Sequence, residues 1–280
     1  MLDSGVAAGF SNLAGTAARI VEADIRDGAA LADALEGCTA IVHLAAQTSV
    51  PDSVARPMDD LAANVDASVA LFEAARTHGI RRVVFASSNA VVGGHPPPAR
   101  EDLVPFPVSP YGAAKASVEA YLLAYHAAYG FEGVSLRFAN AYGPWSAHKN
   151  SVVAAFIKAY LRGGPLTIRG TGRQTRDFVH ADDITAVVLA CLDAPAELVA
   201  NEVFQVGTGA ETSLLELVGL LFETGGHGVP IEHAPGSPGD VPRNVSDIAK
   251  AHSVLGYSPR VSLRDGLAQT LAWFRDNWRA

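Results

Sequence analysis

The stretch RVVFASSNAVVG, residues 82–93, decides the fold class of this chain. Its first half, Arg82–Ser87, is rich in apolar β-formers that do not alternate with polar residues, which predicts a strand buried on both faces. The same texture recurs at Ala18–Glu22, Ala40–Ala45 and Val134–Phe138, with helical stretches between these runs. Strands that alternate with helices at this spacing predict βαβ units, and therefore an α/β fold with a doubly wound parallel sheet.

Two of the intervening helices carry clear sequence signals. Asp27 can cap a helix over Ala29–Glu36, and Gly37 would end it. A second, longer helix would stop at Gly79, and its apolar residues share one face: Leu61, Val65, Val69 and Phe72.

The texture of the chain changes after Pro144, where glycine and proline become frequent and the expected elements shorten. We therefore expect a sheet domain over residues 1–144 and a smaller lobe over residues 145–280. The run Val203–Val206 reads as one more strand returning to the sheet, which would interleave the lobe with the last sheet elements. Sheets of this kind bind ligands at the carboxyl ends of their strands.

Composition narrows the functional classes. The 280 residues are 49% apolar and 18% charged, which suits a buried core and excludes a disordered chain. A net charge of -8 argues against nucleic acid or an anionic membrane as a partner. Cys38 and Cys191 stand in apolar runs, which predicts buried thiols in a reducing compartment. Without a spanning run or a leader, we expect a cytoplasmic protein.

The sharpest chemical signal is Tyr111-Gly112-Ala113-Ala114-Lys115, which follows Ser109-Pro110. Pro110 suits a helix start, and the i, i+4 spacing puts Tyr111 and Lys115 on one face. A nearby ammonium favours the phenolate and moves the tyrosine pKa toward neutrality, where a phenol can act as a base. The alternative is a surface Tyr–Lys pair, although 7 Tyr and 4 Lys in 280 residues give about 0.1 such pair by chance.

A serine upstream favours the catalytic interpretation. Ser88 would lie just past the carboxyl end of the strand over Arg82–Ser87, where its hydroxyl can bind a substrate oxygen and share a proton with Tyr111. The alternative for any lone Ser-Ser pair is a turn serine.

Eight stretches in order carry a resemblance to a known family. They are residues 24–27 (DIRD), 42–46 (VHLAA), 64–65 (NV), 87–93 (SSNAVVG), 111–115 (YGAAK), 137–144 (RFANAYGP), 176–180 (RDFVH) and 238–240 (PGD). In them the chain resembles an extended short-chain dehydrogenase/reductase of the NAD-dependent epimerase/dehydratase family, and within it the UDP-glucose 4-epimerases. The resemblance implies a Rossmann-type sheet that binds NAD, a C-terminal substrate lobe and a homodimer paired through helices 59–78 and 111–129.

The resemblance also assigns roles to single residues. Tyr111 would be the general base, Lys115 would hold the nicotinamide ribose and lower the tyrosine pKa, and Ser88 would align the sugar hydroxyl. The remaining residues implied for the cofactor NAD are Asp3, Asp24, Ile25, Leu44, Ala45, Ala46 and Asn64. Those implied for the nucleotide-sugar substrate, besides Ser88, are Asn140, Arg176 and Asp240. Guanidinium groups suit phosphate oxygens, while the alternative for Arg176 is a local ion pair with Asp177.

The residues after Ser88 indicate the subclass. Family members that eliminate water carry a carboxyl directly after the serine position, whereas Asn89 and Ala90 cannot exchange protons in that way. We therefore expect 4-epimerisation of a UDP-glucose or UDP-galactose type substrate, by transient oxidation at C4 and hydride return. The alternatives are an NAD(P)H-dependent sugar or keto reductase and a non-catalytic remnant that binds the nucleotide sugar. His43 and His180 lack convincing metal-ligand spacing.

The N-terminal residues depart from the family pattern. Gly5, Gly9 and Gly15 do not have the spacing of the phosphate-binding turn, and only eight residues separate Gly15 from Asp24. The stretch Leu2–Gly5 instead resembles the end of the second strand, so about 30 residues, one strand and its helix, are expected to be missing. We therefore expect a fragment with two open strand edges. Asp3 would favour NAD over NADP, because its carboxylate repels a 2′-phosphate.

Two smaller departures concern the substrate pocket. Val92 stands where a tyrosine is common, and Ser237 stands where an arginine is usual before Pro238-Gly239-Asp240. Arg243 or Arg176 could compensate for the missing diphosphate contact.

Overall fold

Two compact units, each with its own hydrophobic core, make up the chain. The computed structural model describes residues 1–5, 10, 13–236 and 241–279. Unit 1 contains residues 1–95, 101–137 and 188–205, and unit 2 contains residues 96–100, 138–187 and 206–280. The division differs from the expected boundary after residue 144, because residues 138–144 lie in unit 2 and the chain returns to unit 1 at residues 188–205.

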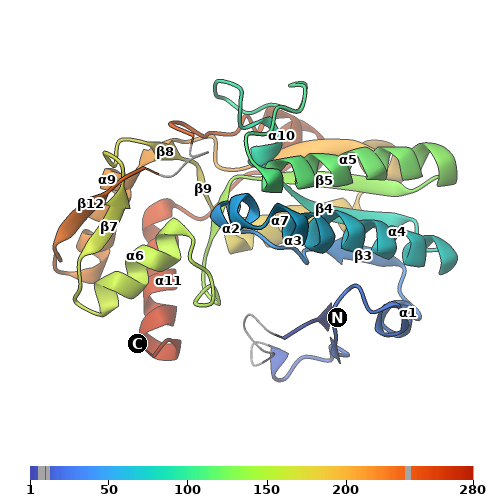
Figure 1. Cartoon of the computed structure of the whole chain (residues 1–280), viewed down its shortest axis with the longest axis horizontal. Helices are drawn as coiled ribbons and strands as arrows, with labels where there is room; N and C mark the ends of the chain where they lie inside the picture. The colour runs from blue at the N-terminus through green and yellow to red at the C-terminus, as the bar shows by residue number, and fades with distance from the viewer. Residues whose placement is uncertain (6–9, 11–12, 237–240, 280) are drawn as a thin grey trace. The chain divides into compact units, whose positions relative to one another are not determined.

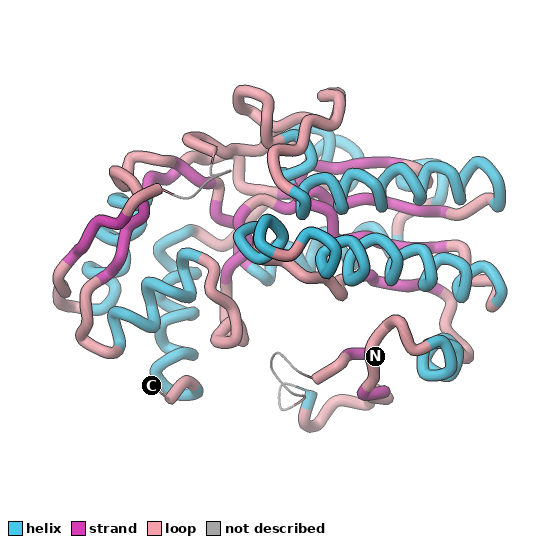
Figure 2. The backbone as a smooth tube through the Cα atoms, in the orientation of Figure 1, coloured by secondary structure: helices cyan, strands magenta, loops and turns pink. Residues whose placement is uncertain are grey.

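A four-stranded sheet forms the centre of unit 1. Its order is β10 (Glu202–Val206), β5 (Glu132–Phe138), β4 (Arg82–Ser88) and β3 (Ala40–His43). Strands β3 and β4 run parallel, with His43 opposite Phe85. Figure 1 shows α4 (Ala67–Thr77) and α5 (Pro110–Tyr129) side by side along these strands, and Figure 2 shows the same helical layer against the strands. The expectation of a parallel, Rossmann-type α/β fold is confirmed.

The helices of unit 1 follow the expected signals with one exception. Helix α1 (Gly28–Leu35) begins at Asp27, whose carboxylate accepts hydrogen bonds from the backbone N–H groups of Ala29 and Ala30. The longer expected helix is interrupted, since α3 (Pro57–Leu61) passes through a π-helical turn over Ala62–Asp66 into α4. The remaining elements are α2 (Val50–Ala55), a 3-10 turn over Asn89–Val92, α7 (Ala181–Asp193, shared with unit 2) and α8 (Ala196–Val199).

The core of unit 1 forms where helices cover the sheet. Phe72 from α4 and Phe85 from β4 are almost completely buried, and Phe72 meets Tyr125 of α5 edge to face at 5.5 Å between ring centroids. Each such ring contributes about 1.5–3 kcal/mol when it leaves water. This core fixes α5 against β4, and the two elements carry the predicted catalytic residues.

One edge of the sheet has no strand partner within the described residues. Strands β1 (Leu2–Asp3) and β2 (Val21–Glu22) pair in parallel as a separate two-stranded sheet, and β3 pairs with β4 alone. Val42 and Leu44 are exposed beside the free edge of β3. Among the strands that the structure describes, β1 thus has β2 as its partner and β3 has β4.

The described part of unit 2 is built from short strand pairs and from helices of different lengths. Its pairs are β6 (Asn140–Tyr142) with β9 (Phe178–His180), β8 (Thr175–Arg176) with β11 (Thr212–Ser213) and β7 (Leu166–Arg169) with β12 (Ile231–Ala234). Its core is covered by α6 (Val152–Leu161), α9 (Leu214–Gly225) and α11 (Leu263–Asn277), while α10 (Ala249–Leu255) follows the β12 region. The short, irregular elements agree with the glycine- and proline-rich sequence.

The structure also bears on membrane-spanning helices and on the burial of the two cysteines. No helix within the described ranges is long and apolar enough to cross a membrane. Cys191 is buried as expected, but the expectation of a buried Cys38 is wrong: Cys38 follows the end of α1 and is exposed.

Candidate active site

Ser88 and Tyr111 meet at the junction of β4 and α5. Ser88 ends β4 and caps the following 3-10 turn, where its Oγ accepts a hydrogen bond from the Ala90 N–H at 3.2 Å. Tyr111 lies in the first turn of α5, which Ser109 caps through the Gly112 N–H at 3.2 Å. The Ser88 hydroxyl hydrogen-bonds to the phenol of Tyr111. The structure therefore joins the two side chains expected to share a proton.

Lys115 lies one turn further along α5, and its side chain is buried. Its Nζ donates a hydrogen bond to the backbone carbonyl of Ala86 at 2.8 Å. The same Nζ is 4.8 Å from the ring centroid of Phe85 and 5.8 Å from that of Tyr111. The three residues Ser88, Tyr111 and Lys115 thus form one constellation at the carboxyl end of β4.

The electrostatics of this constellation differ from the sequence-based expectation. Burial raises the pKa of the Tyr111 phenol, the Asp60 carboxylate raises it further, and the Ser88 hydrogen bond opposes both. Burial also lowers the pKa of Lys115 to about 8, against the attraction of Asp60 and Glu119. In the chain without a ligand, burial therefore raises the tyrosine pKa, whereas the Tyr–Lys spacing predicted a lowered value.

Gly112 allows α5 to approach the turn that carries Ser88. A Cβ on Gly112 would lie 2.5 Å from the carbonyl oxygen of Ala90 and 3.1 Å from Cβ of Pro107. Only a residue without a side chain fits this contact. The glycine after Tyr111 thus keeps the phenol within reach of the Ser88 hydroxyl.

A buried polar cluster beside these residues was not found from the sequence. Asp60, on α3, accepts hydrogen bonds at Oδ1 from the side-chain amides of Asn64 and Gln47, both at 3.0 Å. Ser53, on α2, accepts a hydrogen bond from the Tyr111 N–H at 3.2 Å. The i, i+4 spacing of Asp60 and Asn64 was the available signal, but it does not distinguish a buried pair from a surface pair.

Asn64 links the segment after β3 to the π-helical turn. Its Oδ1 accepts a hydrogen bond from the Gln47 N–H at 2.9 Å, and its Nδ2 donates to the Gln47 carbonyl at 3.0 Å. His43, at the end of β3, is buried, and its Nε2 lies 2.8 Å from Oγ of Ser68. Burial, with Lys115 adding to it, lowers the pKa of His43 to about 3, so this histidine is neutral.

The other residues expected at the cofactor lie at the end of β1 or directly after β2 and β3. Asp3 ends β1, and its Oδ1 accepts the Gly5 N–H at 2.8 Å. Asp24 forms an ion pair with Arg26 at 2.6 Å, and this hydrogen bonding lowers the pKa of Asp24 to about 2. Ile25 packs against the core of unit 1, while Leu44 is exposed and leads into residues 45–46. Their roles at the cofactor remain predictions.

Two of the three residues expected only at the nucleotide sugar lie in neighbouring segments of unit 2. The Asn140 N–H donates to the carbonyl of Asp177 at 2.9 Å, and Arg176 precedes Asp177. The Asp177 carboxylate accepts hydrogen bonds from Thr208, through its N–H at 2.8 Å and its hydroxyl at 2.6 Å. The Arg243 guanidinium pairs with Glu211 at 3.0 Å. Asp240, the third, and Ser237 lie outside the described residues, so their expected contacts are not tested.

The residues near Tyr111 fit the nicotinamide end of a dinucleotide. A buried ammonium, a phenol and a hydroxyl lie together at the end of a parallel strand, where α/β sheets bind ligands. The apolar side chain of Leu44 is 60% exposed at the end of the next strand, β3. Within the described residues, no group of three or more His, Cys, Asp or Glu side chains could hold a metal ion.

A parallel Rossmann-type sheet with this serine, tyrosine and lysine defines the short-chain dehydrogenase/reductase class. Residues 3–207 match the family model described as "NAD dependent epimerase/dehydratase family". The chain therefore belongs to this family of NAD-dependent enzymes that act on nucleotide sugars.

Proteins similar to this chain include both epimerases and dehydratases. A UDP-glucose 4-epimerase of Mycolicibacterium smegmatis is 41% identical over 84% of this chain and 76% of its own length. A UDP-glucose 4-epimerase of Thermotoga maritima, solved with UDP-glucose, has a TM-score of 0.91 at 33% identity and covers 99% of this chain and 91% of its own. A dTDP-glucose 4,6-dehydratase of Streptomyces venezuelae, solved with NAD and TYD, has a TM-score of 0.90 at 35% identity, with 99% and 87% covered.

Proposed function

We propose that this chain catalyses the NAD-dependent 4-epimerisation of a UDP-hexose of the UDP-glucose/UDP-galactose type. The observation that carries the proposal is the contact between Ser88 and Tyr111, with the Lys115 ammonium one helical turn away. The 41% identity to the mycobacterial UDP-glucose 4-epimerase supports the choice of substrate.

In the proposed reaction Tyr111 accepts the proton of the C4 hydroxyl. Ser88 hydrogen-bonds to the same sugar oxygen and holds it near the phenolate oxygen, while the Lys115 ammonium stabilises the phenolate that accepts this proton. NAD, when bound, would supply the hydride acceptor at C4 and a positive charge that favours the phenolate. After inversion at C4, Tyr111 would return the proton to the sugar oxygen, with Ser88 still holding that oxygen.

Asn89 and Ala90 favour epimerisation over dehydration. Elimination of water requires a second acid and base near the sugar, and carboxyl groups normally supply both. Asn89 is 3% exposed and, like Ala90, cannot gain or lose a proton in the working pH range. We therefore propose that UDP-glucose is converted without loss of water, although dehydratases of 34–35% identity belong to the same family.

The decisive experiment incubates the purified chain with UDP-glucose, without a cofactor or with added NAD, NADH or NADPH. Proton NMR then follows UDP-glucose and UDP-galactose. Formation of UDP-galactose without net NADH supports the epimerase. Stoichiometric consumption of NADH or NADPH with a keto-sugar supports a reductase instead. Calorimetric binding of UDP-glucose without binding of NAD supports the non-catalytic remnant.

A matched pair of variants tests the role of the phenol. Tyr111→Phe removes the base and is expected to lower kcat by about 10²–10⁴-fold, the range typical of general-base catalysis. Tyr121→Phe is the control, because Tyr121 lies on the same helix and is 43% exposed. Equal activity of the two variants contradicts the mechanism.

We also propose that the chain forms a homodimer through α4 and α5. In support, α5 exposes the large side chains of Tyr121, Leu123 and Tyr129, and exposed apolar side chains often mark association sites. Leu123→Glu is expected to shift the sedimentation coefficient to that of a monomer. A wild-type chain that sediments as a monomer refutes the proposal.

A further inference from the structure

Asp60 is an acidic side chain buried next to the proposed catalytic residues. It is 1% exposed, whereas the side chain of the adjacent Asp59 is 70% exposed and lies 3.6 Å from Arg56. Burying a carboxylate costs several kcal/mol unless charges and hydrogen bonds compensate. The position of Asp60 therefore requires partners inside unit 1.

Hydrogen bonds tie Asp60 to the segment that follows β3. Its Oδ1 accepts from Nδ2 of Asn64 and from Nε2 of Gln47, both at 3.0 Å. Asn64 also bonds to the backbone N–H and carbonyl of Gln47. Asn64 lies in a π-helical turn, a rare geometry that is often found at functional sites. Asp60 thus fixes the segment in which Leu44–Ala46 are expected to meet the cofactor.

The charge that compensates Asp60 is the ammonium of Lys115. Helix α3 packs against α5, and Asp60 and Lys115 interact electrostatically. Glu119, the other acidic group acting on Lys115, already forms an ion pair with Arg137 at 2.7 Å. His43 faces Lys115 from β3 but is neutral. Within the described residues, Asp60 is therefore the acidic neighbour of Lys115 that no arginine balances.

We propose that Asp60 is a positioning residue of this site: its carboxylate is the counter-ion that keeps Lys115 charged, and it anchors Asn64 and Gln47 beside the nicotinamide position. The proposal deepens the function proposed above. A negative charge favours the proton-bound form of each neighbour, so Asp60 raises the pKa of both Lys115 and Tyr111. Removing the charge should lower both values.

A titration without substrate tests the counter-ion directly. The chain has four lysines, Lys115, Lys149, Lys158 and Lys250, so ¹³C-labelled lysine gives a small set of resolvable signals. The pKa of Lys115 is about 8 in the wild type, and Asp60→Asn should lower it by about one unit. Asp59→Asn removes the same charge from an exposed position of the same helix and should leave it unchanged.

Asp60→Asn also keeps an oxygen that can accept the amide hydrogen bonds, so a change in titration reports charge rather than lost shape. Thermal unfolding of each variant checks that it folds. If Asp60→Asn does not fold, Lys115→Met gives the reverse measurement by carboxyl ¹³C NMR, since loss of the ammonium should raise the pKa of Asp60. The proposal is overturned if the pKa of Lys115 is unchanged in folded Asp60→Asn, or if the pKa of Asp60 is unchanged in folded Lys115→Met.

The pH profile of turnover provides the second test. Activity of the wild type should fall as the pH rises through about 8, where Lys115 loses its proton. In Asp60→Asn the acidic and the alkaline side of the pH profile should both move to lower pH. On the alkaline side kcat/KM should be about tenfold lower than in the wild type. Asp60→Glu should restore the wild-type profile. If Asp60→Asn shifts the pKa of Lys115 but neither the wild type nor any variant has epimerase activity, the proposed reaction is refuted. The role of Asp60 as the counter-ion of Lys115 then still stands. If the pH profile of Asp60→Asn is not shifted from that of the wild type and only kcat is lower, Asp60 is not a positioning residue of this site.

Discussion

Replacing Gly112 by alanine adds one methyl group at the closest approach between α5 and the turn that carries Ser88. The new Cβ would lie 2.5 Å from the Ala90 carbonyl oxygen, whereas ordinary contacts begin at 3.4 Å. The first turn of α5 must therefore move away by about 0.9 Å. Because Tyr111 is the preceding residue, its phenol moves with the helix and away from the Ser88 hydroxyl.

The magnitude follows from the dependence of catalysis on position. A misplacement of about 1 Å can cost 10²-fold in rate, so Gly112→Ala is expected to lower kcat by about 10²-fold. Overpacking of this kind also costs about 1–3 kcal/mol of stability. Both quantities are measurable, one by turnover of UDP-glucose and the other by urea denaturation.

Gly219→Ala is the matched control for this change. Gly219 lies inside α9, and a Cβ there meets nothing within 4 Å. The substitution should leave kcat unchanged and stabilise the chain by up to about 1 kcal/mol, the helix-propensity difference between glycine and alanine. If Gly112→Ala keeps wild-type kcat and wild-type stability, the close approach of α5 does not position Tyr111 and the reasoning fails.

Three further substitutions test the packing of the two units by denaturant unfolding. Phe72→Ala empties a fully buried position and should cost about 3–5 kcal/mol, whereas a loss under 1 kcal/mol contradicts the assigned core. Arg137→Met leaves Glu119 buried without its ion pair and should also cost about 3–5 kcal/mol, most of it recovered when Glu119→Leu is added. Gly266→Ala places a methyl group against the hydroxyl of Tyr142 and should cost about 1–3 kcal/mol. Adding Tyr142→Phe should relieve the part of this strain that the hydroxyl causes, and a double variant as unstable as Gly266→Ala alone argues against this contact.

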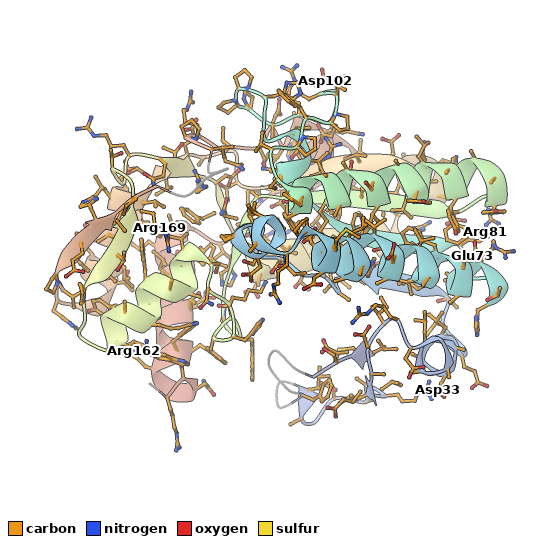
Figure 3. All side chains as sticks on the ribbon, in the orientation of Figure 1. Asp33, Glu73, Arg81, Asp102, Arg162 and Arg169 are labelled. Atoms are coloured by element: carbon orange, nitrogen blue, oxygen red, sulfur yellow. The ribbon has the colours of Figure 1, made fainter. Side chains whose placement is uncertain are left out.

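Exposed ion pairs on the surface contribute little to the stability of the chain. Figure 3 labels Glu73 on α4 and Arg169 at the end of β7, and it labels Arg81 and Arg162 directly before β4 and directly after α6. Glu73 pairs with Arg76 at 2.9 Å, with both side chains more than 40% exposed. Such pairs contribute about 0–1 kcal/mol, so their removal should be nearly silent.

Local composition was sufficient to predict the principal strands and several helix ends. The runs at Arg82–Ser87 and Val203–Val206 became β4 and β10 within a residue of the expected bounds, because a strand buried on both faces requires consecutive apolar β-formers. The Asp27 cap and the start of α5 at Pro110 were likewise readable, since each depends on neighbouring atoms only. The strand expected over Ala18–Glu22 is shorter, with pairing confined to Val21–Glu22.

Long-range contacts decided what the sequence missed. The helix expected through Leu61 and Phe72 contains a π-helical turn, which no local residue pattern predicts. In this turn the Asn64 side chain is hydrogen-bonded to Gln47, which comes from the loop after β3. The direction of the Tyr111 pKa was misjudged for the same reason: burial is a property of the packed fold and not of the Tyr–Lys spacing.

The amino-acid order by itself determined the α/β class and the family, and it indicated Ser88, Tyr111 and Lys115 as candidate catalytic residues, because these follow from local periodicity and from short motifs. Only the tertiary structure decided which of two adjacent aspartates is buried. Asp59 and Asp60 are chemically identical, and the packing of α3 against α5 leaves one in water and puts the other beside the lysine. Desolvation and charge then act on the buried carboxylate alone.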